Sequence, residues 1–108
     1  MNPKLKSMNV DFLFNAILCL ETEEECYAFF DDLCTISELK ALSQRLQVAK
    51  MLTEKRVYSD IVAQTGASTA TISRVNRSLT YGSDGYSVIF ERMEAKEKAT
   101  AEAAEKEE

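Results

Sequence analysis

Residues 58–79, with the sequence YSDIVAQTGASTATISRVNRSL, predict two short helices joined by a tight turn. Gly66 is expected to end the first helix, because glycine adopts a left-handed backbone without a steric penalty. Ser68 is a candidate cap for the second helix, and the small Ala67 fits beneath the corner. The angle between the helices would be fixed by the apolar side chains Ile61, Val62, Ile72, Val75 and Leu79. This spacing is typical of a helix-turn-helix.

The other face of the second helix carries small polar side chains and two arginines, with no acidic residue between positions 61 and 81. Arginine and asparagine make paired hydrogen bonds to guanine and adenine in the major groove, and small residues let a helix approach DNA closely. The sequence therefore predicts a DNA-binding surface formed by Ser68, Thr69, Ala70, Thr71, Ser73, Arg74, Asn76 and Arg77. Phosphate contacts are expected at the start of the first helix from Lys55, Arg56 and Tyr58.

Charge is segregated along the 108 residues, although the chain as a whole carries −5. Residues 1–39 carry two basic and eight acidic side chains, a net charge of −6. Residues 40–81 carry seven basic and two acidic side chains, a net charge of +5, and residues 82–108 have a net charge of −4. A basic segment favours an anionic partner, because local field matters more than total charge. The alternative is a protein-interaction module, in which the acidic N-terminal third contacts a basic partner and the helix-turn-helix is only a scaffold.

Helical patterns flank this motif, and no segment alternates as a strand would. Asn9 is a candidate cap for a helix to about Leu20 that is apolar nearly all round, which indicates a subunit interface. A capping box at Thr22–Glu25 begins the next helix, and the helix after it begins at Thr35–Glu38 or at Ser37. We expect one helical domain over residues 9–95, after a frayed N-terminus at residues 1–8. Residues 96–108 are rich in Lys, Glu and Ala and predict a frayed or disordered tail.

The composition argues against an enzyme, a metal site and a membrane protein. The chain has no histidine, and its three cysteines form no Cys-x-x-Cys pair, so we expect free thiols and no metal centre. Cys26 and Cys34 lie among acidic residues, which do not suit a nucleophilic thiolate. No apolar run reaches the roughly 18 residues needed to span a bilayer, and no signal peptide is recognisable. These features predict a cytoplasmic protein without catalytic activity.

Two stretches carry a resemblance to a known family: TISELKALSQRL at residues 35–46 and ASTATISRVNRSL at residues 67–79. They resemble the Trp repressor superfamily, and more closely its YerC/YecD branch of bacterial proteins. The resemblance covers about residues 9–93. It implies an all-α, multi-helix Trp-repressor-like fold with a helix-turn-helix, assembled as an intertwined homodimer. The implied function is that of a transcriptional regulator, most simply a repressor, which binds double-stranded operator DNA.

The same resemblance indicates where an effector binds in the tryptophan-responsive members. Their two arginines that sandwich the indole ring, a pocket threonine and a serine near the amino group match Arg45, Arg74, Thr35 and Ser78. Their glycine after the second arginine is Val75 here, and its branched side chain would intrude on the space of the ring. We therefore expect no cofactor, and in particular no L-tryptophan corepressor. Phosphate contacts or an ion pair are the alternative roles for the two arginines.

Overall fold

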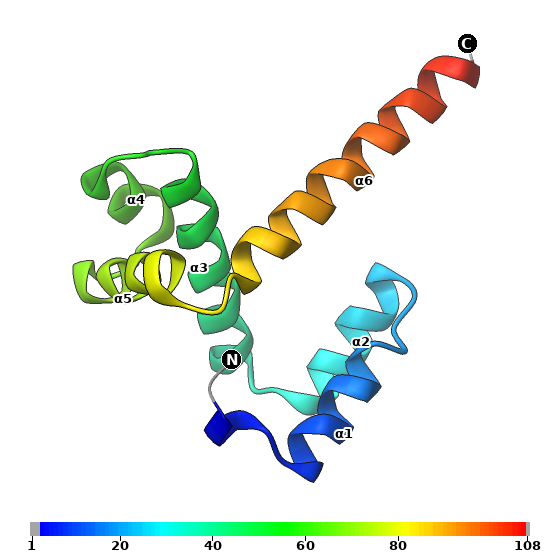
Figure 1. The fold of residues 1–108 in the computed structure, drawn as a ribbon, viewed down its shortest axis with the longest axis horizontal. Coiled ribbons are helices and arrows are strands. Elements are labelled where there is room, and N and C mark those ends of the chain that lie inside the picture. Colours follow the sequence, from blue (N-terminus) through cyan, green and yellow to red (C-terminus); the bar gives the residue numbers. More distant parts are fainter. Residues whose placement is uncertain (1–2, 108) are drawn as a thin grey trace. The chain divides into compact units, whose positions relative to one another are not determined.

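The structure is a computed structural model that describes residues 3–107, and over this range the chain is helical with no strand (Figure 1). A 3-10 helix at Pro3–Leu5 precedes α1 (Met8–Ile17), α2 (Glu23–Leu33), α3 (Ile36–Thr53), α4 (Tyr58–Thr65), α5 (Thr69–Tyr81) and α6 (Gly85–Glu107). The prediction of an all-α chain is confirmed. The chain forms two compact units, residues 1–44 and residues 45–108. Residues 1, 2 and 108, at the ends predicted to fray, lie outside the described residues.

The first helix begins earlier and ends earlier than predicted. Ser7 caps it, because its extended backbone places Oγ 3.2 Å from the Val10 amide, from which it accepts a hydrogen bond. The prediction of Asn9 as the cap is wrong, and Asn9 lies inside the first turn. The last turn tightens, as the Leu20 amide donates to the Ile17 carbonyl, and the α-helix ends at Ile17.

Thr22 caps α2 as predicted, and of the two predicted starts for the next helix it is Thr35 rather than Ser37 that caps α3. Thr22 Oγ1 accepts a hydrogen bond from the Glu25 amide at 3.1 Å, while the Glu25 carboxylate accepts one from the Glu21 amide at 2.9 Å. At the start of α3 the exchange is reciprocal, with Thr35 Oγ1 accepting from the Glu38 amide and Glu38 Oε1 accepting from the Thr35 amide. Hydrogen bonds to the amide and side chain of Thr35 hold the pKa of Glu38 below its usual range.

The N-terminal unit, residues 1–44, has no buried side chain among its described residues. Two aromatic rings pack edge to face, Phe29 and Phe30, with centroids 5.5 Å apart. Many large apolar side chains stay exposed: Met8, Phe12, Phe14, Leu18, Tyr27, Leu33, Ile36, Leu39 and Leu42. A single copy therefore leaves the apolar surface of this unit in contact with solvent.

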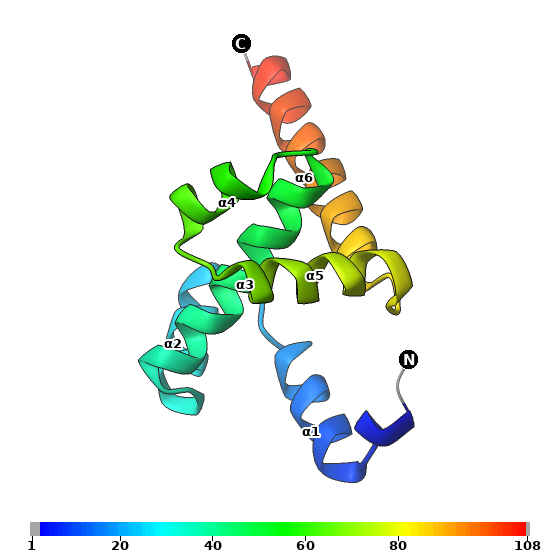
Figure 2. The ribbon, with the colours of Figure 1, turned by 90° about the vertical axis from the view of Figure 1, so that its left-hand side faces the viewer.

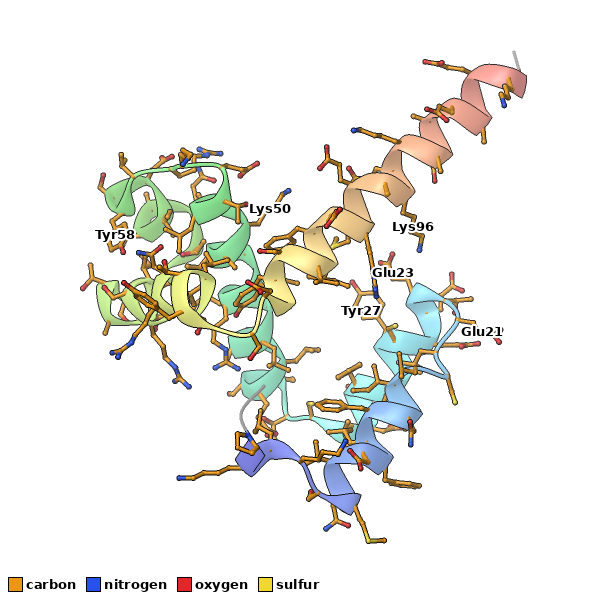
Figure 3. All side chains as sticks on the ribbon, in the orientation of Figure 1. Glu21, Glu23, Tyr27, Lys50, Tyr58 and Lys96 are labelled. Atoms are coloured by element: carbon orange, nitrogen blue, oxygen red, sulfur yellow. The ribbon has the colours of Figure 1, made fainter. Side chains whose placement is uncertain are left out.

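The core of the protein lies in the C-terminal unit, residues 45–108. Its buried members come from the second half of α3, from α4 and α5 and from their connection: Val48, Ala49, Met51, Ile61, Ala67, Ile72 and Val75. Leu52, Leu79, Tyr86 and Phe90 pack against them, which brings the start of α6 onto the same core. Lys50 lies over the Phe90 ring, with Nζ 5.3 Å from the centroid, and Figure 3 labels Lys50 on α3. This core fixes the arrangement of α4 and α5.

Helix α6 continues beyond the part of it that packs on the core (Figure 1). Its residues 91–106 are exposed, yet they remain helical, whereas the sequence predicts fraying after Ala95. Alanine, glutamate and lysine all have high helix propensity. In addition, Lys98 pairs with Glu94 one turn earlier at 3.4 Å. Local propensity therefore accounts for the part of α6 beyond Phe90, which has no core contact.

Candidate nucleic-acid interface

The predicted corner between the two short helices is confirmed (Figure 2). Helix α4 ends at Gly66, which has φ +71°, and the Gly66 amide donates to the Val62 carbonyl at 2.9 Å. A side chain at this backbone angle is strained, so glycine is required by conformation rather than by space. Helix α5 begins after Ser68, whose Oγ accepts a hydrogen bond from the Thr71 amide at 3.1 Å.

The two helices are held at this corner by apolar packing. Ile61 on α4 and Ile72 on α5 are completely buried, and Ala67 between them is 2% exposed. Val62, which the sequence assigns to the same contact, is instead 37% exposed. It follows Ile61 directly, and neighbouring positions on a helix point about 100° apart. The α4 side of the contact is therefore made by Ile61.

The face of α5 away from this core is accessible, as a groove-binding surface requires. Of the eight residues of α5 and its cap that are predicted to bind DNA, seven are exposed and Thr71 is half-buried. The exposed residues are Ser68, Thr69, Ala70, Ser73, Arg74, Asn76 and Arg77. Ser68 Oγ also lies 3.0 Å from Thr71 Oγ1, so the first turn of α5 carries a hydrogen-bonded hydroxyl pair. Helix α5 thus presents backbone amides, hydroxyls and the two cationic groups of Arg74 and Arg77 on its exposed face.

Helix α5 is longer than predicted, and this adds one residue to the surface. The sequence predicts the second helix only as far as Leu79, but the helix runs through Tyr81 and stops at Gly82. Tyr81 is 82% exposed and lies four residues after Arg77, so both side chains occupy the same helix face. The signal in the sequence is the absence of a helix breaker between Leu79 and Gly82.

The side chains predicted to contact phosphates lie at the turn between α3 and α4. Lys55 is exposed and adopts a left-handed backbone with φ +62°. The Arg56 amide donates to the Met51 carbonyl at 3.1 Å, which closes the end of α3. Arg56 Nη1 forms an ion pair with Asp60 Oδ2 at 2.8 Å. Tyr58, labelled in Figure 3, is the first residue of α4 and is 38% exposed.

The residues matched to an effector site are distributed over different elements. Thr35 caps α3 in the N-terminal unit, Arg45 is half-buried on α3, and Arg74 and Ser78 are exposed on α5. A hollow of about 350 Å³ lies beside Ser78 and is otherwise lined by Gly82, Ser83, Gly85 and Tyr86. Neither arginine lines this hollow.

Other chemistry has little support in the described part of the chain. Cys19 is exposed, Cys26 and Cys34 are half-buried, and all three are free. Within residues 3–107 no group of three or more cysteine or carboxylate side chains is arranged to hold a metal ion. Over the same range no helix combines the length and the hydropathy needed to cross a bilayer. The exposed face of α5 is accordingly the strongest candidate site.

Most of the chain is similar to known proteins. The family model described as Trp repressor protein matches residues 8–94. The uncharacterised protein YerC of Bacillus subtilis is 55% identical over 94 residues, which are 87% of this chain and 90% of that protein. A crystal structure of a Trp-repressor-type protein from Staphylococcus aureus has a TM-score of 0.83 at 57% identity, covering 87% of this chain and 95% of its own. A TrpR-like protein from Eubacterium eligens has a TM-score of 0.82 at 62% identity, covering 85% and 95%.

Proposed function

This chain belongs to the Trp repressor family, and from that membership we propose that it is a transcriptional regulator that binds operator DNA as a homodimer. The helix-turn-helix of α4 and α5 is the proposed contact, with α5 in the major groove and α4 across the backbone. The observation that carries this proposal is the exposed outer face of α5, which is free of acidic residues and rests on a buried core. Repression is the proposed mode of regulation.

The charge of the surface supports a polyanionic partner. Between Lys55 and Ser83 the only acidic residue is Asp60, and it is paired with Arg56. Arg74 and Arg77 are exposed on α5, and Lys55 is exposed beside α4. Positive side chains that replace the counterions of DNA supply most of the non-specific affinity of such proteins. Asn76 and the hydroxyls of the first turn add groups able to recognise base edges or phosphates.

The apolar surface of the N-terminal unit supports a homodimer. Phe12 is 77% exposed and Leu18 is 81% exposed, and both lie at or just beyond helix α1. A second copy of the chain would cover this surface, and it would place two α5 helices on one operator. We propose that the N-terminal units form this contact. No membrane partner is proposed.

The experiment that tests the function selects bound sequences from a randomised duplex pool and then titrates the selected duplex against salt. We expect two half-sites related by two-fold symmetry, with centres about 10 base pairs or a multiple of that apart. The logarithm of the binding constant should fall linearly with the logarithm of the salt concentration. A chain that enriches no sequence and shows no salt-dependent binding to duplex DNA would contradict the proposal.

The acidic N-terminal third favours one alternative, a protein-interaction module that uses the helix-turn-helix as a scaffold. Residues 1–39 carry a net charge of −6, and Glu23 and Glu24 are exposed at the start of α2. This function requires binding to a basic polypeptide and no affinity for duplex DNA. The same titration, with polylysine and duplex DNA as the two ligands, separates the two functions.

Replacing Arg77 by Ala is expected to cost about 1–3 kcal/mol of operator affinity if its guanidinium binds a base. Specificity should then relax at a single position of the half-site. If Arg77 contacts only phosphate, the loss is uniform across sequences and the salt slope falls by about one. Lys106→Ala, which removes the same charge from the exposed end of α6, is the matched control and should leave affinity unchanged. An unaffected Arg77→Ala variant would remove Arg77 from the proposed interface.

L-tryptophan is expected to produce no saturable heat at micromolar concentration in a calorimetric titration. Val75 is 2% exposed and belongs to the core of the helix-turn-helix. Its side chain would occupy space that the glycine of the tryptophan-responsive members leaves open for the indole ring. Operator affinity should be the same with and without the amino acid. Micromolar binding, or a shift of operator affinity on adding L-tryptophan, would contradict this prediction. It would support a corepressor site at Thr35, Arg45, Arg74 and Ser78.

A further inference from the structure

Asp60 is unusual because it is the only acidic residue between Lys55 and Ser83. This stretch includes the whole proposed DNA-binding surface. A carboxylate close to bound phosphates repels them, so its presence in this segment calls for a physical reason. The structure offers one, which is the contact that Asp60 makes with Arg56.

The contact is short, and the backbones on both sides of it are hydrogen-bonded. Arg56 Nη1 lies 2.8 Å from Asp60 Oδ2, which joins the turn before α4 to the first turn of that helix. The Arg56 amide is held by the Met51 carbonyl at 3.1 Å, and the Asp60 amide is held by the Val57 carbonyl at 3.1 Å. Because the backbones of both residues are fixed by these hydrogen bonds, the remaining freedom is mainly that of the Arg56 side chain.

The guanidinium of Arg56 keeps donors for a second acceptor. A guanidinium carries five N–H donors, and this ion pair uses one nitrogen, Nη1. The Arg56 side chain is 41% exposed and that of Asp60 is 40% exposed, so an anion can approach the pair from solvent. The pair also lies at the N-terminal end of α4, where the helix dipole favours an anion.

We propose that Asp60 is a positioning residue, which orients the Arg56 guanidinium so that its remaining donors bind a phosphate of the DNA backbone. This inference rests on the proposed function and specifies how one of its phosphate contacts is formed. Binding a phosphate with a free arginine orders a long side chain and costs conformational entropy. A guanidinium already held by a carboxylate loses less freedom when the phosphate arrives.

The sign of one substitution tests the proposal. Asp60→Asn removes a negative charge at nearly constant shape, so a carboxylate that only repels DNA would give tighter binding when it is replaced. A positioning carboxylate gives the opposite result, and we expect affinity for a selected or random duplex to fall about 3- to 10-fold, or roughly 0.7–1.4 kcal/mol. Asp60→Glu keeps the charge and should recover most of the affinity. Thermal unfolding of each variant checks that the fold is retained.

Asp84→Asn is the matched control for the loss of charge. Asp84 lies in the loop before α6 with φ +62°, a backbone that asparagine tolerates. Removing its charge should leave affinity unchanged or slightly higher, because the carboxylate is outside the proposed contact. A loss equal to that of Asp60→Asn would overturn the proposal, since any carboxylate would then have the same effect.

The pair is tested further in a double-mutant cycle with Arg56→Gln. Arg56→Gln alone should weaken binding and lower the magnitude of the salt slope by about one. In that background Asp60→Asn should no longer weaken binding, and it should tighten it because only repulsion remains. Additive losses, or a single Asp60→Asn variant that binds more tightly than the natural chain, would overturn the inference. A natural chain that binds no duplex at all would overturn the proposed function and this inference with it.

Discussion

Ile72→Ala should lower the free energy of unfolding by about 2–5 kcal/mol. Ile72 is completely buried on α5, where it packs in the one core that also contains Ile61 and Val75. Removing its outer carbons leaves a cavity at the point where α4 and α5 meet. Since a domain of this size has only about 5–15 kcal/mol of stability in total, the loss is a large fraction of it.

Urea denaturation followed by circular dichroism measures this change, at one fixed protein concentration because association contributes to stability. Val62→Ala is the control, since Val62 belongs to the same motif but is 37% exposed, and it should cost much less. Equal losses for the two variants would mean that Ile72 is not the centre of this core. The Ile72 variant should also lose operator affinity at temperatures where the natural chain still binds.

Replacing both Phe12 and Leu18 by Glu should convert the proposed dimer to single chains and reduce operator affinity by about 100-fold or more. The two side chains are among the most exposed large apolar groups of the N-terminal unit. Two added carboxylates would have to be desolvated for the surfaces to meet, and unpaired buried charge is strongly disfavoured. A single chain contacts one half-site and loses the advantage of a linked second contact.

Sedimentation equilibrium gives the molar mass, and the selected duplex gives the affinity. Val88→Glu is the control, as Val88 is 43% exposed on α6 in the other unit, and it should change neither quantity. A doubly substituted chain that still sediments as a dimer would place the subunit contact elsewhere. A variant that is monomeric but keeps full operator affinity would show that DNA binding does not require dimerisation.

Much of the helix-turn-helix could be predicted because its signals are local. Glycine favours the left-handed backbone that ends a helix, and serine favours the N-cap position. Gly66 ends α4 and Ser68 caps α5 in this way. The same holds for the helix cap at Thr22, whereas Thr35 and Ser37 are both possible caps for α3 and the structure uses Thr35. The predicted Trp-repressor-like fold is confirmed by the family model and by the similar crystal structures.

The errors arose where several residues satisfy the same local rule. Ser7 and Asn9 are both good caps, and only the backbone of Ser7 extends in the required way. Helix α5 reaches Tyr81 because no residue stops it earlier, and α6 reaches Glu107 because its composition favours helix without a core. Helix ends depend on such small differences in free energy.

The candidate site was predictable as a set of residues but not as a set of contacts. The exposure of Arg74, Asn76 and Arg77 follows from helix periodicity, since Ile72 and Val75 occupy the buried face. The ion pair between Arg56 and Asp60 depends on side-chain rotamers, which spacing alone does not determine. DNA binding by these residues stays a prediction.

The buried side chains of the described residues all lie in the C-terminal unit, and this affects how the proposed regulator would respond to its own concentration. No side chain among residues 3–44 is fully buried, so in the proposed homodimer this part of the chain would gain stability when a second copy covers it. At low abundance the amount of that homodimer would rise with the square of the number of chains, and occupancy of the proposed operator would respond more steeply than synthesis does. A modest change in expression would thus be amplified at the promoter without any small molecule.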